Sequence, residues 1–526
     1  MSRPPLAPRP RRERIAPLSL ALLGLLLPLL VTPPAPAQAG GETKEAADPT
    51  GDAFPRPPEP TTTEHTIRIG GAEIPYRATA GTLTLRREDG SERGHIFSVS
   101  YLRSGIEDTS RRPVTFVFNG GPGSSSVWLH LGMLGPRRVV MDDEGFPLSP
   151  PGRLVDNEHS LLDVTDLVFI DPVMTGYSRP AEGEEKGQFH GFREDVESVA
   201  EFIRLWTTRH ERWDSPKFLC GESYGTTRAA GLAGELQGRH GMYLNGLMLV
   251  SSILQFQTAR FDVGNDLPYV LFLPTYTATA WYHGQLAADL QEDLPRALAE
   301  AEEFALGDYT LALMRGSRLE GEERKGIAGR LARLTGLSEE FVLDCDLRPS
   351  ISRFVKELRR DEGITVGRLD SRFRGRDRDD AGERYEFDPS YAAIQGPYTS
   401  CANAYLREEL GYAFDMPYEI LSGRVRPWSY ANVENEYLNV AETLRRAMEQ
   451  NPALHVHVAN GYYDLATPYF ATHYTFDHLS SDPAVNERVT MSHYESGHMM
   501  YIQLASLAEM RRQLLPWLEK ASGAEQ

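Results

Sequence analysis

Cysteine is scarce in this chain, with three residues among 526, and this scarcity excludes a small domain held together by several disulfides. Cys220 lies in an apolar run and is expected to be an inert, buried filler. Cys345 and Cys401 both lie in the second half of the chain, and export would allow them to form one disulfide. No Cys/His spacing predicts a metal site, and no cofactor is expected.

Basic residues are also few, because 55 Lys and Arg stand against 74 Asp and Glu and give a formal net charge of −19. An acidic chain is repelled by phosphate backbones and by anionic lipid headgroups. Nucleic acid and anionic membrane surfaces are therefore not expected as partners. The charge leaves the oligomeric state open.

The apolar stretch near the N-terminus, at residues 17–31, is shorter than the roughly twenty residues needed to cross a bilayer, and Pro28 interrupts it. Arginines precede this stretch, and A-x-A sequences follow it at residues 35–37 and 37–39. This order is typical of a secretory signal peptide, which we predict over residues 1–39. The protein is therefore expected to be exported, to the periplasm or the medium, without a stable membrane anchor after cleavage.

The most informative motif is G-E-S-Y-G at residues 221–225. The apolar residues 217–220 before it predict a short buried strand, and residues 226–236, rich in Ala, Leu and Thr, predict a helix. A strand, a tight turn and a helix form a nucleophile elbow, which exposes the serine hydroxyl at the edge of a sheet. Ser223 is therefore the predicted nucleophile.

A serine nucleophile needs a general base and an acid that orients the base, and in hydrolases with this elbow they follow in the order acid, then histidine. Asp464 follows the predicted strand at 455–459, so it occupies the position of the acid. Two histidines, His493 and His498, follow the next predicted strand at 488–491. His498 lies further past the strand end, behind a flexible glycine, and is the predicted base.

The oxyanion hole has its own candidate in N-G-G-P-G at residues 119–123, directly after the apolar, β-branched and aromatic run at 114–118. Glycines after a strand allow backbone N–H groups to approach a bound oxygen closely. The predicted donors are the N–H groups of Gly121 and Tyr224. Met499, beside the predicted base, is expected to line the substrate pocket.

Several motifs together resemble the serine carboxypeptidase family, peptidase S10, and suggest a secreted bacterial member. The resemblance implies the triad Ser223, Asp464 and His498, and it implies that Asn119 and Glu222 hold the free carboxylate of a peptide substrate. Carboxyl groups that share a proton with that carboxylate would favour mildly acidic pH. The matching motifs are N-G-G-P-G-S-S-S at 119–126, L-G-P at 134–136, Asn157 and Ser160, D-P-V at 171–173, G-Y-S at 176–178, G-E-S-Y-G at 221–225 and G-H-M at 497–499.

Two positions depart from the family pattern. Met133 stands where the family has a second carboxylate-binding glutamate, and a thioether cannot replace that acid. Glu222 would then work alone, or Arg137 or a residue of the inserted region would substitute. Ser124 replaces a cysteine that is usual in the family, so one common disulfide is absent.

The predicted fold is an α/β-hydrolase fold: a mostly parallel central sheet flanked by helices, with a large inserted cap domain. After the signal peptide, we expect a disordered linker at 40–63, rich in Pro, Glu and Thr. The core is expected in two parts, residues 64–257 and 441–526. The long interval between Ser223 and Asp464 predicts a helical cap over residues 258–440.

The sequence therefore predicts a secreted serine carboxypeptidase-like enzyme that releases C-terminal residues from peptides through an acyl-enzyme on Ser223. One alternative is an esterase or acyltransferase with the same triad and no carboxylate recognition. The other alternative is an inactive secreted binding protein that keeps the fold. Peptides are the expected substrates.

Overall fold

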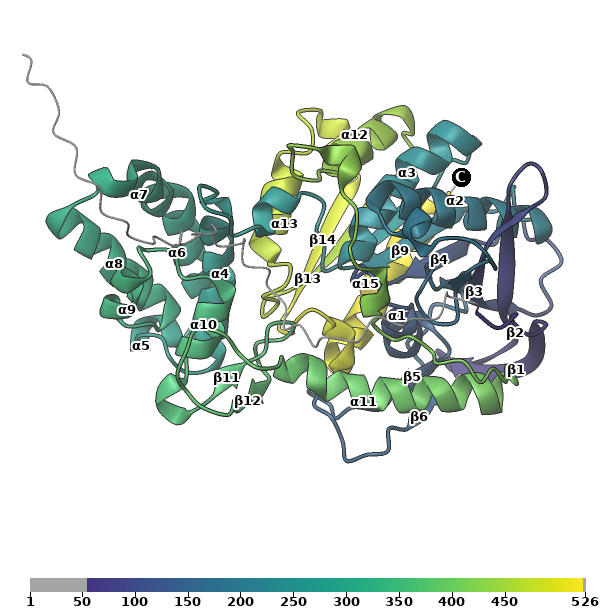
Figure 1. Cartoon of the computed structure of the whole chain (residues 1–526), viewed down its shortest axis with the longest axis horizontal. Coiled ribbons are helices and arrows are strands. Elements are labelled where there is room, and N and C mark those ends of the chain that lie inside the picture. The colour runs from purple at the N-terminus through teal and green to yellow at the C-terminus, as the bar shows by residue number, and fades with distance from the viewer. Residues whose placement is uncertain (1–53, 524–526) are drawn as a thin grey trace, which may run out of the picture. The chain divides into compact units, whose positions relative to one another are not determined.

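A computed structural model of the chain describes residues 54–523 (Figure 1). The predicted signal peptide at 1–39 and most of the predicted linker lie outside the described residues. The linker prediction is wrong at its end, because strand β1 already begins at Thr61. Thr61, Thr62 and Thr63 pair with Ala80, Thr79 and Ala78 of the next strand, which β-branched residues favour.

The sheet opens with three long antiparallel strands. The turn between the first two contains Gly70 and Gly71, both at positive φ, where a side chain would be strained. The third strand, β3, also pairs antiparallel with β8 and with β7, and β7 is the first strand of the parallel part of the sheet. The bounds of these strands are β1 Thr61–Ile69, β2 Ala72–Arg86, β3 Glu92–Arg103 and β8 Arg179–Pro180.

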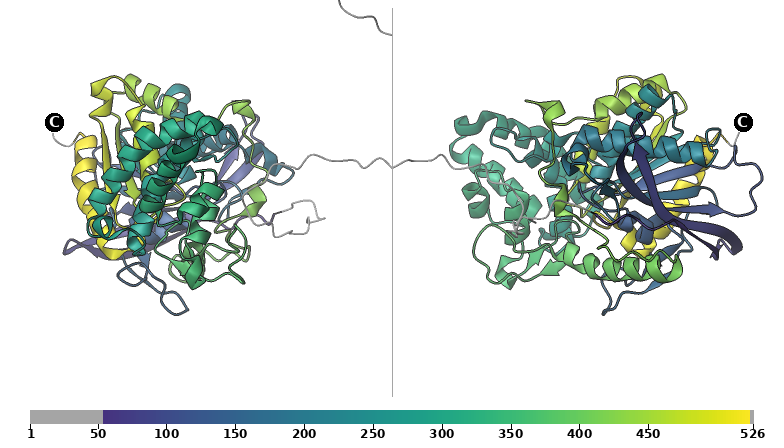
Figure 2. Two further views of the ribbon diagram at one scale, coloured as in Figure 1. Left: turned by 90° about the vertical axis from the view of Figure 1, so that its left-hand side faces the viewer. Right: turned by 45° about the vertical axis from the view of Figure 1, so that its right-hand side comes forward.

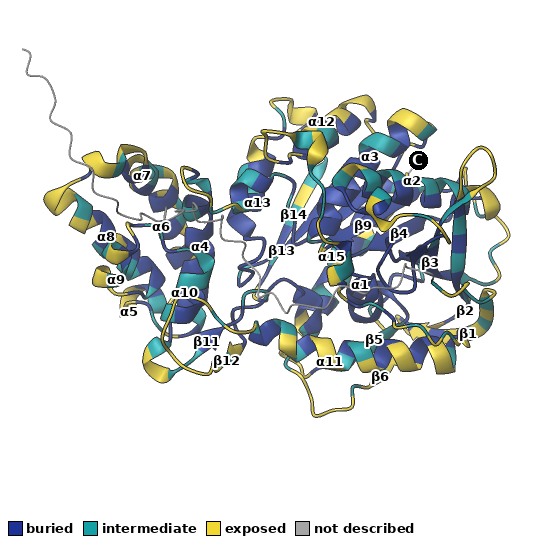
Figure 3. Cartoon of the chain, in the orientation of Figure 1, coloured by how far each residue is buried: buried dark blue, intermediate teal, exposed yellow. Residues whose placement is uncertain are grey.

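The rest of the sheet is parallel, with strand order β7-β4-β9-β10-β13-β14. Most residues of these central strands are buried, as expected when helices cover both faces of a parallel sheet (Figure 3). The ends of β9, β13 and β14 therefore lie at one edge of the sheet. The bounds are β4 Val114–Phe118, β7 Asp166–Ile170, β9 Lys217–Glu222, β10 Gly246–Val250, β13 His455–Gly461 and β14 Val489–Tyr494.

Side chains along each central strand alternate between two hydrophobic cores. Val114, Phe116 and Phe118 belong to one core, whereas Val117 belongs to the other. The first core packs against α2 Phe192–Arg209, α3 Tyr224–His240 and α12 Ala441–Gln450. The second core packs against α1 Val127–Leu129, α11 Pro389–Ala404 and α15 Leu504–Ala521. Helices on both faces of a mostly parallel sheet confirm the predicted fold class.

The region between β10 and α12 falls into two structural parts (Figures 1 and 2). Helices α4 to α10 enclose a third hydrophobic core of their own, which also takes in Tyr463 and Leu465 from the loop after β13. Helix α11 instead packs on the second core of the sheet. The aromatic run at 267–281 belongs to α4 and is largely buried in this third core, as the burial tendency of such residues favours.

Proline marks the start of α4 and α6. Two small strand pairs, β5 with β6 and β11 with β12, lie outside the main sheet. The remaining bounds are α4 Leu267–Tyr282, α5 Ala288–Gln291, α6 Leu294–Phe304, α7 Thr310–Arg315, α8 Gly321–Thr335, α9 Glu339–Asp344, α10 Ile351–Glu357, α13 Tyr469–Asp477, α14 Pro483–Asn486, β5 Arg137–Val139, β6 Leu154–Asp156, β11 Thr365–Val366 and β12 Arg374–Gly375.

The disulfide considered for Cys345 and Cys401 is not formed, and all three cysteines are free and buried. Cys345 lies at the end of α9, whereas Cys401 lies in α11, whose side chains pack on the core of the sheet. The two thiols thus belong to separate parts of the inserted region. Among residues 54–523, no helix is long and apolar enough to cross a membrane.

A buried ion-pair network fixes the start of β7. Asp166 accepts hydrogen bonds from Arg112 Nε at 2.8 Å, Arg212 Nη1 at 2.5 Å and the Arg103 N–H at 2.9 Å. We expect Asp166→Ala to lower the free energy of unfolding by about 3–5 kcal/mol, because two buried guanidinium groups would lose their counterion. Urea unfolding of the two proteins measures this difference. Equal midpoints would show that the pair contributes nothing to stability.

Candidate active site

Ser223 lies in the turn between β9 and α3, with φ of 59° and ψ of −129°. This strained backbone is possible because glycines flank it: a Cβ on Gly221 would lie 2.2 Å from the Gly225 carbonyl oxygen. The Ser223 N–H donates to the Val250 carbonyl at 2.9 Å, which ties the turn to β10. The serine is only partly buried, as a nucleophile elbow requires.

Asp464 and His498 lie together, as the order of the motifs predicts. His498 Nδ1 and Asp464 Oδ2 are 2.7 Å apart, and both residues are buried. Asp464 also accepts from the N–H groups of Ala466 and Thr467, and from the Thr467 hydroxyl at 2.7 Å. These bonds fix the carboxylate, so it can hold the imidazole in one orientation.

Parallel pairing of β13 with β14 brings these two residues to the same edge of the sheet, because the loops after both strands start side by side. The rival histidine, His493, is still within β14 and pairs with His473 at 2.8 Å. Ser223 reaches the same edge through β9. In the described residues its hydroxyl makes no hydrogen bond to His498, a contact that often tightens only when substrate binds.

Opposing effects act on the pKa of His498. Burial lowers the pKa of the imidazole, but the charge of Asp464, its hydrogen bond and the charge of Glu222 outweigh burial and raise the pKa above its usual value. A histidine of raised pKa is a stronger base. The arrangement suits an imidazole that accepts the proton of a serine hydroxyl.

The loop at residues 119–123 lies against the elbow. A Cβ on Gly120 would lie 2.4 Å from the Tyr224 nitrogen, so glycine is required at this close approach. Gly121 has φ of 103°, which favours glycine again. Arg228 of α3 fixes the loop by donating to the Asn119 carbonyl at 2.5 Å. The N–H of Tyr224 lies in the first turn of α3, where helices have no internal acceptor.

Glu222 and Asn119 are both buried next to Ser223. Asn119 Oδ1 accepts from the Leu129 N–H at 3.1 Å, whereas Nδ2 has no hydrogen-bond partner. Burial raises the pKa of Glu222 to about 7, and the charge of Asp464 raises it further, against the lowering effects of His498, Tyr501 and the neighbouring Asn119 amide. The pair thus offers an amide donor without a hydrogen bond of normal geometry, next to a carboxyl that keeps its proton at acidic pH.

Tyr501 is a site residue that the motifs did not reveal. Its hydroxyl donates to Glu222 Oε2. Met133 is 2% exposed and belongs to the core of the sheet. The hydrogen-bond partner of Glu222 is therefore a tyrosine three residues after His498. The sequence gives one hint of this role, which is that Tyr501 is three residues from His498. Nothing in the local sequence pattern indicates a contact between Tyr501 and Glu222.

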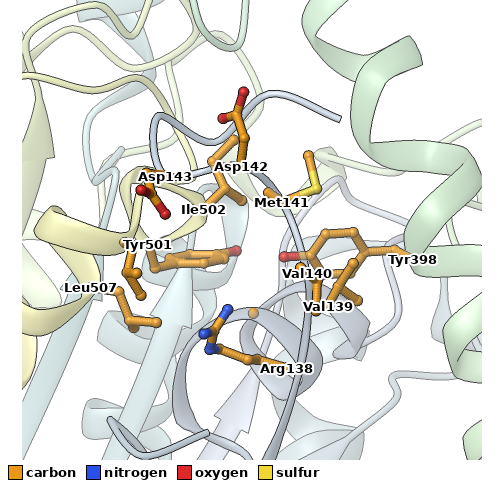
Figure 4. Close-up of a pocket in the computed structure, with 12 residues that line it drawn as sticks. Arg138, Val139, Val140, Met141, Asp142, Asp143, Tyr398, Tyr501, Ile502 and Leu507 are labelled. Atoms are coloured by element: carbon orange, nitrogen blue, oxygen red, sulfur yellow. The ribbon is translucent and has the colours of Figure 1, made fainter. Parts of the chain in front are cut away.

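Behind Glu222 lies a cavity of about 130 Å³. Tyr501 and Tyr398 point their hydroxyls toward one another across it, and Arg138, Asp142 and Asp143 also line it (Figure 4). A space of this size can hold water molecules against these polar groups. The Tyr501 hydroxyl thus connects the buried Glu222 carboxyl to a polar cavity.

Met499 is buried and belongs to the core of the sheet. Arg137, considered as a substitute for the missing acid, pairs instead with Asp156 and Glu409. Within residues 54–523, no three His, Cys, Asp or Glu side chains form a group that could hold a metal ion.

Comparisons with known proteins match part of this chain. The family described as serine carboxypeptidase, peptidase S10, matches residues 80–301. This match includes Asn119, Glu222 and Ser223 but ends before Asp464 and His498. The assignment of those last two residues therefore depends on the order of the motifs and on the geometry.

Three curated relatives share shorter stretches of sequence. The pheromone-processing carboxypeptidase KEX1 of Saccharomyces cerevisiae S288c is 34% identical over 156 residues, which are 28% of this chain and 20% of the relative. KEX1 of Cryptococcus gattii is 29% identical over 192 residues, 36% of this chain and 27% of the relative. Serine carboxypeptidase-like 29 of Arabidopsis thaliana is 28% identical over 127 residues, 24% of this chain and 25% of the relative. The matches span only about a fifth to a quarter of these relatives.

One solved structure shares the fold over most of its length. The crystal structure of Kex1, a prohormone-processing carboxypeptidase from Saccharomyces cerevisiae, superposes with a TM-score of 0.55 and 16% identity, and the match covers 85% of this chain and 92% of that one. The family match and the relatives show that residues 80–301 are similar to the serine carboxypeptidase family, S10, and the solved structure shows a shared fold.

Proposed function

We propose that the protein is a serine carboxypeptidase that uses Ser223 as nucleophile, His498 as general base and Asp464 to orient the imidazole. His498 takes the proton of the Ser223 hydroxyl as its oxygen attacks the scissile carbonyl. The N–H groups of Gly121 and Tyr224 stabilise the oxyanion of the tetrahedral intermediate. His498 then gives the proton to the leaving amine. In the second step His498 takes a proton from water as the water oxygen attacks the acyl-enzyme, and it returns the proton to the Ser223 oxygen as the acid product leaves.

The observation that carries the exopeptidase proposal is the pair of buried groups beside the nucleophile. Asn119 presents an amide donor beside Glu222 that makes no hydrogen bond of normal geometry, and Glu222 keeps its proton up to about pH 7. A protonated carboxyl donates a hydrogen bond to a substrate carboxylate, and an amide N–H donates a second one. Peptides with a free C-terminus are therefore the proposed substrates, and hydrolysis releases their last residue.

One observation favours a second candidate, an esterase or acyltransferase with the same triad. Met133 leaves Glu222 without a second acid, and Tyr501 already occupies one oxygen of Glu222. A site with a single available carboxyl could bind a substrate carboxylate only weakly. Substrates without a free carboxylate would then be cleaved as well as those with one. The two candidates differ in one measurable respect, the benefit that a free carboxylate gives to the rate.

The test compares three substrates that share one acyl group: an N-blocked dipeptide with a free carboxylate, its C-terminal amide and its ester. Rates measured from about pH 4 to pH 8 span the carboxyl and imidazole titrations, and Ser223→Ala controls for contaminating activity. We expect preference for the free acid over the amide at acidic pH. Equal or faster turnover of the amide would replace the carboxypeptidase proposal with the broader hydrolase.

We also propose that the protein is exported. The proposal depends on the arginine-rich start, the apolar stretch at 17–31 and the A-x-A sequences that follow it. N-terminal sequencing of the protein recovered outside the cytoplasm of an expressing bacterium tests it. A mature N-terminus near Gly40 is expected, and recovery of the intact N-terminus from the cytoplasm alone would contradict it.

A further inference from the structure

We infer that residues Arg368–Arg372, a segment of the inserted region, hold the two loops that carry Asp464 and His498, and that Asp370 is the main positioning residue. This inference rests on the proposed function, because it assigns His498 as the base. Asp370 touches neither Ser223 nor the expected substrate groups in the structure. It would act through the backbone of the histidine loop.

The first evidence is a set of backbone hydrogen bonds that reach both loops. The Leu465 N–H, next to Asp464, donates to the Arg368 carbonyl at 3.0 Å. The His498 N–H donates to the Leu369 carbonyl at 2.7 Å. The segment therefore lies between the acid and the base and contacts a residue at or beside each of them.

The Asp370 side chain adds a further contact to the histidine loop. Its carboxylate accepts from the Gly497 N–H at 3.1 Å, directly before His498. Gly497 and Asp370 pack so closely that a Cβ on Gly497 would lie 2.4 Å from the Asp370 Cβ. Glycine is therefore required at position 497 because a side chain there would clash with Asp370. This requirement is separate from the backbone flexibility that a glycine gives the loop.

Arg372 neutralises the Asp370 carboxylate and binds the same loop. Arg372 Nη2 lies 2.7 Å from Asp370 Oδ2 and donates to the Ser496 hydroxyl at 3.0 Å. Asp370 and Arg372 are 3% and 2% exposed. A buried carboxylate with this many partners is rigid, so the position of Gly497 follows the position of the ion pair.

The segment is itself fixed to α4. The Ser371 hydroxyl and Thr279 Oγ1 lie 2.7 Å apart, and the Ser371 carbonyl lies 2.6 Å from His283 Nε2. The Ser371 N–H donates to the Tyr463 carbonyl at 3.0 Å, next to Asp464. Contacts therefore run from α4 through this segment to both loops.

The opposite side of His498 is held by the sheet, since the Ser251 hydroxyl donates to the His498 carbonyl at 2.7 Å. Loss of the Asp370 charge would break the ion pair that fixes the residues before His498, although the backbone bond from His498 to Leu369 would remain. A displacement of about 1 Å in a catalytic group can lower a rate by about 10²-fold. Substrate contacts would remain, so kcat should fall while KM changes little.

The experiment measures kcat, KM and the rate of fluorophosphonate labelling of Ser223 for Asp370→Asn and a matched control, Asp377→Asn. Asp377 pairs with Lys356 at 2.5 Å, both side chains are buried in the inserted region, and the pair has no contact with the triad loops. We expect Asp370→Asn to lower kcat and the labelling rate by about 10- to 100-fold. KM should change less than about 3-fold, and Asp377→Asn should keep both rates near wild type.

Ser496→Ala provides a milder second variant, since it removes only the hydroxyl that Arg372 binds. It should lower kcat several-fold, and this result is decisive if Asp370→Asn does not fold. Unchanged rates in a folded Asp370→Asn or Ser496→Ala protein, or an equal loss in Asp377→Asn, would overturn the positioning role. Failure of the proposed function has a different signature, in which the wild-type enzyme itself is not labelled at Ser223.

Discussion

Replacing Ser223 with alanine is expected to lower kcat by about 10⁴- to 10⁶-fold, the largest effect of any single change in this protein. Alanine keeps the Cβ and can adopt the same strained φ, so the elbow and the fold should persist. Only the attacking oxygen is removed. The oxyanion donors and the binding groups would remain, and they account for the small rate that such variants keep.

His498→Ala should cause a loss of the same order, because serine and base act as one unit. His493→Ala is the matched control, since His493 is a histidine of the neighbouring strand that pairs with His473 instead of Asp464. It should stay within about 3-fold of wild type, as its ring touches none of the reacting groups. The measurement is kcat for the fastest substrate, together with fluorophosphonate labelling.

Two outcomes would contradict the triad. Full activity in Ser223→Ala would exclude the serine as nucleophile, and loss of activity in His493→Ala with retention in His498→Ala would reverse the two histidines. Correctly folded wild-type protein that neither reacts with the probe nor cleaves any ester would favour the inactive binding protein. Each result points to a different residue or function.

The fold was largely predictable because its signals are local. The run at 114–118 and the segment at 455–459 are rich in β-branched or aromatic residues, which favour strands, and both form strands. The order of motifs along the chain led to Asp464 and His498, which the structure joins by a hydrogen bond. The order of strands and motifs predicted which residues meet, because the carboxyl ends of parallel strands lie at the same edge of the sheet.

The remaining features depend on contacts between distant segments, which no local pattern encodes. Tyr501 meets Glu222 although 279 residues separate them, and Asp370 meets Gly497 across 127 residues. Whether Cys345 and Cys401 form a disulfide could not be predicted for the same reason, since their position in one inserted region did not show that the region has two parts.

A second large effect is expected at Glu222, through its dependence on pH. Burial raises the pKa of this carboxyl to about 7, so above that pH it becomes an anion next to the substrate carboxylate. We expect kcat/KM for the free-acid peptide to fall about tenfold per pH unit above pH 7, as the protonated fraction falls. The ester carries no carboxylate, so its rate should show no such decline.

Glu222→Gln should remove this alkaline decline, because glutamine stays neutral and still offers an N–H donor. Glu222→Ala should instead lose about 10- to 100-fold in preference for the free acid at acidic pH, since a hydrogen bond to a charged group contributes about 1.5–3 kcal/mol. Tyr501→Phe should move the decline to higher pH, because the donated hydrogen bond favours the ionised carboxylate. A decline that persists in Glu222→Gln would assign it to another group.

The same ionisation can be measured without any substrate. The pKa of Glu222 is raised to about 7 in the folded protein, whereas an unfolded glutamate titrates near about pH 4.3. Between these values the folded state binds more protons than the unfolded state, so this group's contribution to stability falls as pH rises. Glu222→Gln has no such proton, and its stability relative to wild type should increase by up to roughly 1.4 kcal/mol per pH unit across this window. A stability difference that does not change with pH would show that Glu222 titrates normally, and proton sharing with a substrate carboxylate would then be confined to more acidic pH.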